Sequence, residues 1–229
     1  MLNINKLKIS SAHKQLVDIS FDIKDSIALI GESGSGKSLT LKALLNLLPS
    51  TLKLEKNINS TFELNYDTIG FIPQNPFTSL SMMTKIKDQF FCPIEKKEEV
   101  LKLVDLDISL LNKFPSQLSG GQIQRIVIAI ALSRNIKLLL LDEPTTALDF
   151  ENKTNIINIV NDLKDKLNIN ILFVTHDIES IKDICDDIVI IKNGYVVEFG
   201  KTQEVLNKPQ NEYTKKLLNS SFKNKKFRN

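Results

Sequence analysis

The sequence contains few cysteines and no apolar run long enough to cross a membrane. Its 229 residues include two cysteines, Cys92 and Cys185, which lie far apart in the chain. We therefore expect thiols that pack in a reducing compartment, rather than disulfides or a cysteine-bound metal. The apolar stretches fall well short of the roughly 18 to 20 residues of a membrane-spanning helix, and Lys6 and Lys8 lie where a secretory leader would be apolar. The sequence thus predicts neither a membrane span nor a leader.

The chain also lacks the strong positive charge typical of proteins that bind nucleic acids. Its formal net charge is only +3, and the excess gathers near the C-terminus. We expect residues 219–229 to form a basic, solvated and disordered tail. The remaining composition, 42% hydrophobic, is that of a globular chain able to bury one large α/β core.

A glycine-rich segment follows the short apolar stretch at 27–30. Residues 31–38 fit the pattern G-x-x-x-x-G-K-[ST], in which consecutive backbone N–H groups point at phosphates near a helix N-terminus. Glycines allow the tight turns and leave no Cβ between amide and phosphate. We expect Lys37 to reach the terminal phosphates and Ser38 to offer a hydroxyl to Mg²⁺. The predicted nucleotide contacts are Gly31, Glu32, Ser33, Gly34, Ser35, Gly36, Lys37, Ser38 and Leu39.

A second motif ends a buried strand. Residues 136–141 are almost wholly apolar, as in a parallel strand covered on both faces, and Asp142 and Glu143 follow. Because ligands bind at the carboxyl ends of parallel strands, we expect Asp142 to hold a magnesium-bound water. Glu143 would accept a proton from the water that attacks the γ-phosphate, or orient it. By themselves these carboxylates would as readily cap a turn before Pro144, but the glycine-rich loop favours the metal site.

The pentapeptide Leu-Ser-Gly-Gly-Gln at 118–122 indicates the kind of nucleotide site. With this signature the sequence resembles the ATPase subunits of ABC transporters, and the resemblance covers nearly the whole chain. Further matches follow in the expected order: Gln74 as the Q-loop glutamine, residues 147–149 as the D-loop, and His176 as the switch histidine. Without the other motifs, a lone histidine would more often be a surface or structural residue.

The resemblance implies a fold, a nucleotide and roles for these residues. The implied fold is α/β: a P-loop NTPase core of the ABC type with a largely parallel sheet, an antiparallel β subdomain and a helical signature subdomain. The implied nucleotide is ATP with Mg²⁺, the metal being held by Ser38, Gln74 and Asp142, and the implied catalytic residues are Glu143, His176 and Gln74. Family members pair head to tail, so the signature would act on the ATP of the facing subunit. The residues implied in this contact are Ser119, Gly120, Gly121, Gln122 and Asp149.

The pattern of apolar residues predicts the organisation of the chain. Residues 151–168 place apolar side chains at helical spacing, which predicts a crossover helix between two parallel strands. Two apolar stretches on either side of Asn193-Gly194 predict a β-hairpin. We expect a single ABC ATPase domain over 1–229, made of a nucleotide-binding core (1–76 and 136–218), a helical insert (77–135) and the tail.

Three stretches resemble the branch of peptide and nickel importers: residues 72–81, residues 143–149 with their Thr-Thr pair, and the Pro-Tyr-Thr…Leu-Leu ending at 209–218. This resemblance implies an ATP-hydrolysing subunit that powers the import of oligopeptides, dipeptides or nickel chelates from the cytoplasmic face of the cell membrane. The implied partners are a second ATPase subunit, identical or different, two permease subunits and, indirectly, an extracytoplasmic solute-binding protein. Transported molecules contact those other subunits, so the substrate stays open.

The alternative is an ABC ATPase that serves DNA repair or the ribosome. Chromosome-type members carry a long coiled coil before the signature and ribosome-type members join two cassettes, and this sequence has neither feature. Two questions stay open. Residues 9–16 offer only His13, and no aromatic residue, to contact adenine. In addition, Phe77, Met82 and Met83 would suit either a permease helix or the core of the insert itself.

Overall fold

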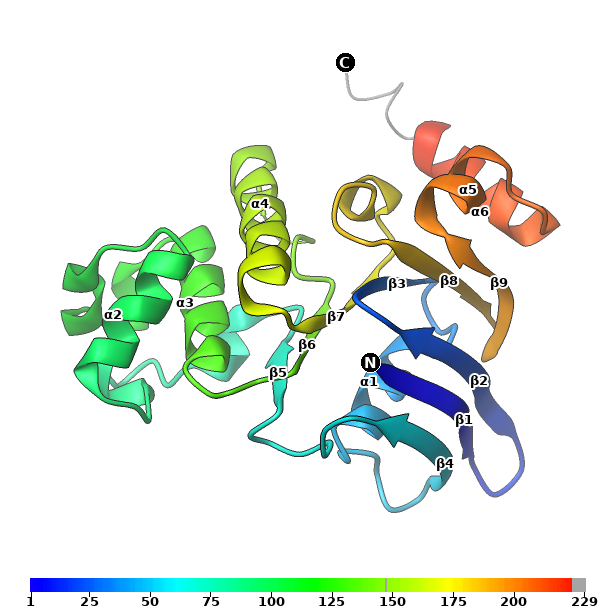
Figure 1. The fold of residues 1–229 in the computed structure, drawn as a ribbon, viewed down its shortest axis with the longest axis horizontal. Helices are drawn as coiled ribbons and strands as arrows, with labels where there is room; N and C mark the ends of the chain where they lie inside the picture. The colour runs from blue at the N-terminus through cyan, green and yellow to red at the C-terminus, as the bar shows by residue number, and fades with distance from the viewer. Residues whose placement is uncertain (147, 224–229) are drawn as a thin grey trace. The chain divides into compact units, whose positions relative to one another are not determined.

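A computed structural model describes residues 1–146 and 148–223, which form two compact units (Figure 1). The first unit comprises residues 1–64 and 170–223, and the second comprises residues 65–169 without residue 147. The second unit contains the segment 77–135, expected to be a helical insert, and extends beyond it on both sides. The assignment of the whole chain to one domain stays a prediction.

The first unit is built on a sheet with the strand order β4-β1-β2-β9-β8-β3-β7. At one side, β4, β1 and β2 pair antiparallel, whereas β8 and β7 pair in parallel with β3 between them. The strands are β1 (Leu2–Ser10), β2 (Gln15–Ile23), β3 (Ser26–Ile30), β4 (Lys53–Ser60), β7 (Asn170–Thr175), β8 (Asp187–Lys192) and β9 (Tyr195–Lys201).

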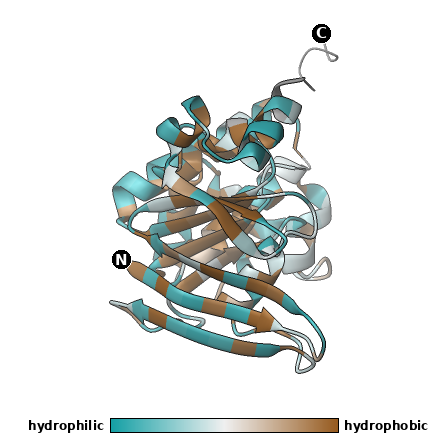
Figure 2. Cartoon of the chain, turned by 90° about the vertical axis from the view of Figure 1, so that its right-hand side faces the viewer, coloured by the Kyte–Doolittle hydropathy of each residue, from teal (hydrophilic) through white to brown (hydrophobic). Residues whose placement is uncertain are grey.

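Hydropathy along these strands matches their positions in the sheet. Strand β1 buries Leu2, Ile4, Leu7 and Ile9, and polar residues point the other way, so the strand is banded brown and teal in Figure 2. A register shift lies between Ile4 and Leu7, which lets both side chains face the core. Every residue of β3 is buried, as expected of a central parallel strand. The strand that leads to the glycine-rich loop is therefore packed on both faces.

The predicted hairpin is confirmed: β8 and β9 pair antiparallel. Asn193 and Gly194 have φ angles of 51° and 85°, the pair of positive values that a tight two-residue hairpin turn requires. The helical elements of this unit are α1 (Lys37–Leu44), η5 (Ile178–Ile181), α5 (Thr202–Asn207) and α6 (Glu212–Lys223). The first residues of the predicted tail, 219–223, continue α6, and residues 224–229 lie outside the described residues.

The second unit combines a pair of parallel strands, β5 (Ile69–Ile72) and β6 (Leu138–Asp142), with helices. Helix α3 is largely buried and packs against α2, α4 and β5, and α2 and α3 lie side by side in Figure 1. The predicted crossover helix is α4, which ends where Asn168 adopts a left-handed conformation with φ of 49°. The helices are α2 (Ile94–Leu103), α3 (Gly120–Leu132), α4 (Phe150–Leu167), η1 (Pro76–Ser79), η2 (Ile86–Gln89), η3 (Ile108–Asn112) and η4 (Pro115–Gln117).

Two sequence features can be located in this fold. Cys92 is partly buried and Cys185 is buried, and neither forms a disulfide within the described part of the chain. Over residues 1–146 and 148–223, the helices do not reach the combination of length and hydropathy that a membrane crossing needs.

Candidate nucleotide site

In the first unit, the glycine-rich loop and His176 leave the sheet at the same edge. Ile30, the last residue of β3, is paired with Thr175, the last residue of β7, so Gly31 and His176 follow neighbouring strand ends. His176 is exposed, and the turn after it is held by the N–H of Asp177, which donates to Thr175 Oγ1 at 2.9 Å. This carboxyl edge is where parallel sheets bind ligands.

The glycine-rich loop has the backbone that the motif predicts. Gly34 and Gly36 have φ angles of 79° and 111°, which side chains other than glycine rarely adopt. A Cβ atom on Gly31 would lie 2.3 Å from the carbonyl oxygen of Ile191, so that position admits only glycine without a shift of the backbone. Gly36 is the N-cap of α1, so the loop ends at the positive end of a helix, which favours an anion.

Lys37 is buried and lies against the loop. It is only 7% exposed, and its Nζ donates to the carbonyl oxygens of Gly31 at 2.7 Å and Glu32 at 3.1 Å. An ammonium group held at the centre of a phosphate-binding loop supplies charge where a polyphosphate would be most negative. Ser38, the next residue, is exposed on the first turn of α1.

Ser35 provides a test of whether this loop fits phosphate. Its hydroxyl is buried, the residue being 4% exposed, and Oγ has no hydrogen-bond partner among the described residues. A buried hydroxyl without a partner is costly, and a phosphate oxygen would accept its hydrogen bond. The orphan hydroxyl, the positive-φ glycines and the buried lysine together fit a polyphosphate.

In the second unit, the Q-loop and the end of β6 meet. Ile72 of β5 pairs with Leu141 of β6, and Gln74 and Glu143 both follow at the carboxyl edge. Glu143 Oε2 accepts hydrogen bonds from Gln74 Nε2 at 3.4 Å and from Thr146 Oγ1 at 3.0 Å. The backbone of Glu143 has φ of 48°, an uncommon conformation for a residue with a side chain. The two catalytic candidates of this unit are therefore in contact.

The three proposed magnesium ligands offer oxygen atoms only. Ser38 has a hydroxyl, Asp142 a carboxylate and Gln74 an amide oxygen, the donor types that Mg²⁺ prefers. Asp142 is half-buried, whereas Ser38 and Gln74 are exposed. Within the described part of the chain, no group of three or more His, Cys, Asp or Glu side chains is arranged to hold a metal ion. The chemistry of the donor set fits a cation that a nucleotide brings with it, sharing its ligands with phosphate oxygens and water.

The signature forms the start of α3 and caps it. Ser119 Oγ accepts from the N–H of Gln122 at 3.3 Å, and Gln122 Oε1 accepts from the N–H of Ser119 at 3.0 Å, a reciprocal capping box. A Cβ atom on Gly120 would meet no heavy atom within 4 Å, whereas one on Gly121 would lie 2.1 Å from Asn152 Oδ1. The space beside Gly120 at the start of α3 is thus open, whereas the lack of a side chain on Gly121 lets Asn152 of α4 pack closely against α3.

Asn152 connects the signature with the D-loop. Its backbone N–H donates to Asp149 Oδ1 at 2.9 Å and its Nδ2 donates to Asp149 Oδ2 at 2.7 Å. The backbone hydrogen bond, followed by the side-chain one, lowers the pKa of Asp149. Asp149 is also the N-cap of α4. Ala147, another D-loop residue, lies outside the described residues.

Sequence reasoning missed two participants in this unit, Thr146 and Asn152. Thr146 was part of a recognised Thr-Thr pair, and its spacing of three from Glu143 is the signal that a turn would bring them together. Asn152 carries no such signal, since its contact with Gly121 comes from the packing of α4 on α3.

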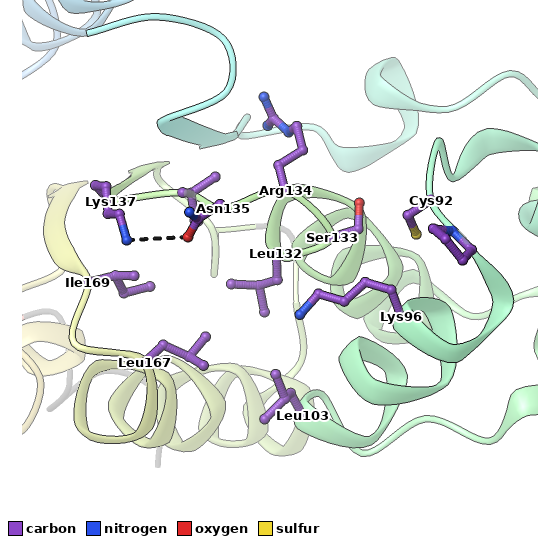
Figure 3. Close-up of a pocket in the computed structure, with 12 residues that line it drawn as sticks. Cys92, Lys96, Leu103, Leu132, Ser133, Arg134, Asn135, Lys137, Leu167 and Ile169 are labelled. Atoms are coloured by element: carbon purple, nitrogen blue, oxygen red, sulfur yellow. Dashed lines mark hydrogen bonds between the residues drawn. The ribbon is translucent and has the colours of Figure 1, made fainter. Parts of the chain in front are cut away.

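The second unit also contains a cavity of about 390 Å³, shown in Figure 3, that contains none of the predicted nucleotide residues. Three residues with cationic side chains line it, but each side chain already contacts groups of the protein. Lys96 pairs with Glu99 at 2.7 Å, Lys137 donates to Asn135 Oδ1 at 3.2 Å, and the Arg134 guanidinium lies 4.0 Å from the ring centroid of Tyr66. In Figure 3 the Arg134 side chain points away from the cavity. The cavity therefore shares no lining residue with the candidate nucleotide site.

Comparison with known proteins agrees with these motifs. A model of the ABC transporter family matches residues 16–146, and the chain belongs to this family. It is 34% identical to the oligopeptide transport ATP-binding protein OppD of Bacillus subtilis over 89% of its length, and 34% identical to AppD of the same organism over 96%. It is 32% identical to the dipeptide transport ATP-binding protein DppF of Haemophilus influenzae over 91%. The chain spans 65% of OppD, 78% of AppD and 70% of DppF.

Solved structures show the same fold. The chain matches cbiO1 of Clostridium perfringens, part of the ABC transporter complex cbiONQ, with a TM-score of 0.79 at 25% identity over 90% of each chain. It matches the ATP-binding cassette MJ0796, dimeric and bound to ADP and phosphate, with a TM-score of 0.72 at 25% identity over 88% of this chain and 99% of that one. The predicted α/β fold of the ABC ATPase type is confirmed.

Proposed function

We propose that this chain is the ATP-binding and ATP-hydrolysing subunit of a membrane importer of oligopeptides or dipeptides. The observation that carries the proposal of ATP binding is the glycine-rich loop, with its buried Lys37, its orphan Ser35 hydroxyl and its helix N-terminus. The names of the relatives OppD, AppD and DppF, which are oligopeptide and dipeptide transport ATP-binding proteins, support the transport role.

Each predicted site residue has a role in this proposal. Lys37 and the amides of residues 31–39 hold the phosphates, and Glu143 accepts the proton of the attacking water. Gln74 orients the Glu143 carboxylate through the hydrogen bond between them, and His176 contacts the γ-phosphate. A bound Mg²⁺ ion would neutralise phosphate charge, and Ser38, Gln74 and Asp142 are the residues that would hold it.

The signature and the D-loop act, in this proposal, on the nucleotide of a facing subunit. Ser119 is exposed and there is open space beside half-buried Gly120 at the N-terminus of α3, which supports this role because an uncovered helix N-terminus favours an anion. The dimer formed by MJ0796 supports the pairing of two cassettes. Residues 119–122 and Asp149 would contact ATP held by a second ATPase subunit, a copy of this chain or a different one.

Four exposed apolar residues in the second unit suit contact with a permease. Phe77 and Met82 are each about two-fifths exposed, Met83 is 89% exposed and Phe91 is 92% exposed. Their exposure favours a partner helix over the core of the segment itself, since large apolar side chains at a surface mark interaction sites. We propose that these four residues contact one of two permease subunits at the cytoplasmic face of the cell membrane, and that the permeases contact a solute-binding protein outside.

The test is to purify the tagged chain from gently solubilised membranes and to identify what accompanies it. The proposal predicts two permeases and a second ATPase subunit. Phe91→Asp should reduce permease recovery at least about fivefold, whereas Leu47→Asp, which changes a residue 64% exposed in the first unit, should not. Recovery with DNA-repair proteins or ribosomes and without a permease would contradict the transport role. A solute-binding protein recovered with the permeases could then be titrated with peptides and with nickel.

A further inference from the structure

The peptide bond between Gly31 and Glu32 is held at both ends. Its carbonyl oxygen accepts from Lys37 Nζ at 2.7 Å, and its N–H donates to the hydroxyl of Tyr213 at 3.1 Å. In a trans peptide the C=O and N–H bonds point in opposite directions, and no cis bond occurs among the described residues. The hydrogen bond to the Tyr213 hydroxyl therefore orients the plane of the Gly31–Glu32 peptide group so that its carbonyl oxygen faces Lys37.

Tyr213 is itself a rigid acceptor. It is only 8% exposed, and the Lys192 ammonium group lies 4.7 Å from the centroid of its ring. Its backbone N–H donates to Asn211 Oδ1 at 2.8 Å at the start of α6. Burial raises the pKa of Tyr213, so the hydroxyl stays protonated at neutral pH. An acceptor fixed in this way orders the loop with little further loss of conformational entropy.

The start of α6 is anchored to β9 through Glu198. The two oxygens of its carboxylate accept from the N–H of Gln210 at 2.7 Å and from that of Asn211 at 3.1 Å. Burial acts to raise the pKa of Glu198, but these hydrogen bonds and the nearby charge of Lys215 help to outweigh it, and the net pKa is lowered. The carboxylate thus stays ionised, and Tyr213 is tied to the same sheet as the loop that it contacts.

A second contact braces the other half of the loop. The N–H of Gly194, in the turn between β8 and β9, donates to the carbonyl oxygen of Ser35 at 2.9 Å. A Cβ atom on Gly194 would lie 2.0 Å from the carbonyl oxygen of Leu16, so the turn is fixed against β2 as well. The loop is thus held by two C-terminal segments, through backbone at Ser35 and through the Tyr213 side chain at Glu32.

We propose that Tyr213 is a positioning residue for the phosphate-binding loop. By accepting the Glu32 N–H, it orients the Gly31–Glu32 peptide that anchors Lys37, and the affinity of the loop for ATP depends on this hydroxyl. The inference rests on the proposed binding of ATP at residues 31–38. In this proposal Tyr213 acts on the loop through the Glu32 N–H and takes no part in the reaction, so its effect should fall on binding and leave the chemical step unchanged.

The test compares Tyr213→Phe with Tyr195→Phe. Both variants lose one tyrosine hydroxyl, but that of Tyr195 accepts from Gln15 Nε2 at 2.7 Å, outside the loop. Tyr213→Phe should raise the Kd and the KM for ATP about three- to tenfold, the range expected for one lost hydrogen bond, with kcat within about twofold of the unmodified chain. Tyr195→Phe should leave all three unchanged. Equal losses in both variants, or a fall in kcat at unchanged KM, would overturn the proposal.

Hydrogen exchange of the Glu32 amide tests the contact without any substitution. In the unmodified chain this amide should be protected, and in Tyr213→Phe it should exchange about tenfold faster or more. Two results would overturn the positioning role. One is a Glu32 amide that is unprotected in the unmodified chain. The other is an ATP affinity that stays unchanged in Tyr213→Phe although the Glu32 amide has lost its protection.

The variant Lys37→Ala distinguishes failure of this inference from failure of the proposed function. Loss of ATP binding in Lys37→Ala beside unchanged binding in Tyr213→Phe rejects only the inference, whereas no ATP binding by the unmodified chain rejects both.

Discussion

Gln74 Nε2 lies 3.4 Å from Glu143 Oε2, so the amide of the Q-loop donates to the carboxylate that we propose as the catalytic base. Thr146 Oγ1 donates to the same oxygen at 3.0 Å. These two donors restrict the rotation of the carboxylate, and the positive φ of Glu143 fixes the direction in which its side chain leaves the strand. A base oriented in advance loses little entropy when the attacking water binds.

Gly121→Ala should destabilise the second unit by about 1–3 kcal/mol, because the added Cβ would lie 2.1 Å from Asn152 Oδ1 and force Asn152 away from Asp149. Gly120→Ala is the matched control: its Cβ meets no heavy atom within 4 Å, and alanine is the better helix former, so it should be neutral or stabilising. Urea denaturation of the two variants measures the difference. If Asn152 is the obstacle, adding Asn152→Ala should remove most of the cost of Gly121→Ala, and an undiminished cost would place the clash elsewhere.

Ser119→Arg should leave the affinity of the isolated chain for ATP within about twofold of the unmodified value. It should weaken ATP-dependent dimerisation at least about tenfold, because a long cationic side chain would block the surface at the start of α3 proposed to face the other subunit. Ser116→Arg adds the same charge at an exposed position three residues earlier and should have little effect. Analytical ultracentrifugation with a Glu143→Gln background measures the dimer. If Ser119→Arg instead abolished nucleotide binding by the monomer, the role of the signature on a facing subunit would be wrong.

The stabilising effect of the Asp149 carboxylate should disappear in acid. Its pKa is lowered by hydrogen bonds from the backbone and side chain of Asn152, so folding favours the ionised form. A group with a lowered folded pKa contributes stability above its unfolded pKa, near 4, and loses it as the pH falls through the folded value. Asp149→Asn keeps a good helix cap but removes the charge. The variant should therefore be less stable than the unmodified chain at pH 7, and the stabilities of the two should converge below about pH 4, where the carboxylate of the unmodified chain becomes protonated. A pH-independent difference would show that the charge is not involved.

The sequence predicted the elements and the edge of the sheet at which the site residues lie, because these follow from local patterns. The apolar stretch at 136–141 is close to the observed β6, and the predicted helix 151–168 is displaced by one residue from α4. Asn193-Gly194 marks the hairpin because only a few residue pairs tolerate two positive φ angles. The loop residues were predicted from the spacing of the motif at 31–38 and Glu143 from its place after an apolar stretch, whereas the signature was assigned from the resemblance to the ABC family.

Contacts between distant residues could not be predicted. Nothing in the sequence around Tyr213 indicates that its hydroxyl contacts Glu32, 181 residues away, since this depends on how α6 lies on β9. The clash that fixes Gly121 depends in the same way on the packing of α4 against α3. The positive φ of Glu143 is set by the turn that follows β6, and Glu143 is not a residue type that indicates such a conformation.

The most direct test of the account is steady-state ATP hydrolysis by the purified chain and by Glu143→Gln. Replacing the carboxylate by an amide keeps the shape but removes the proton acceptor, so phosphate release should fall about 100-fold or more, with ATP binding retained and an ATP-dependent dimer accumulating. Glu151→Gln, which neutralises an exposed carboxylate in the first turn of α4, should keep near-normal turnover. Normal turnover in Glu143→Gln would contradict the assignment of the base, and no hydrolysis by the unmodified chain with its partner subunit present would contradict the ATPase itself.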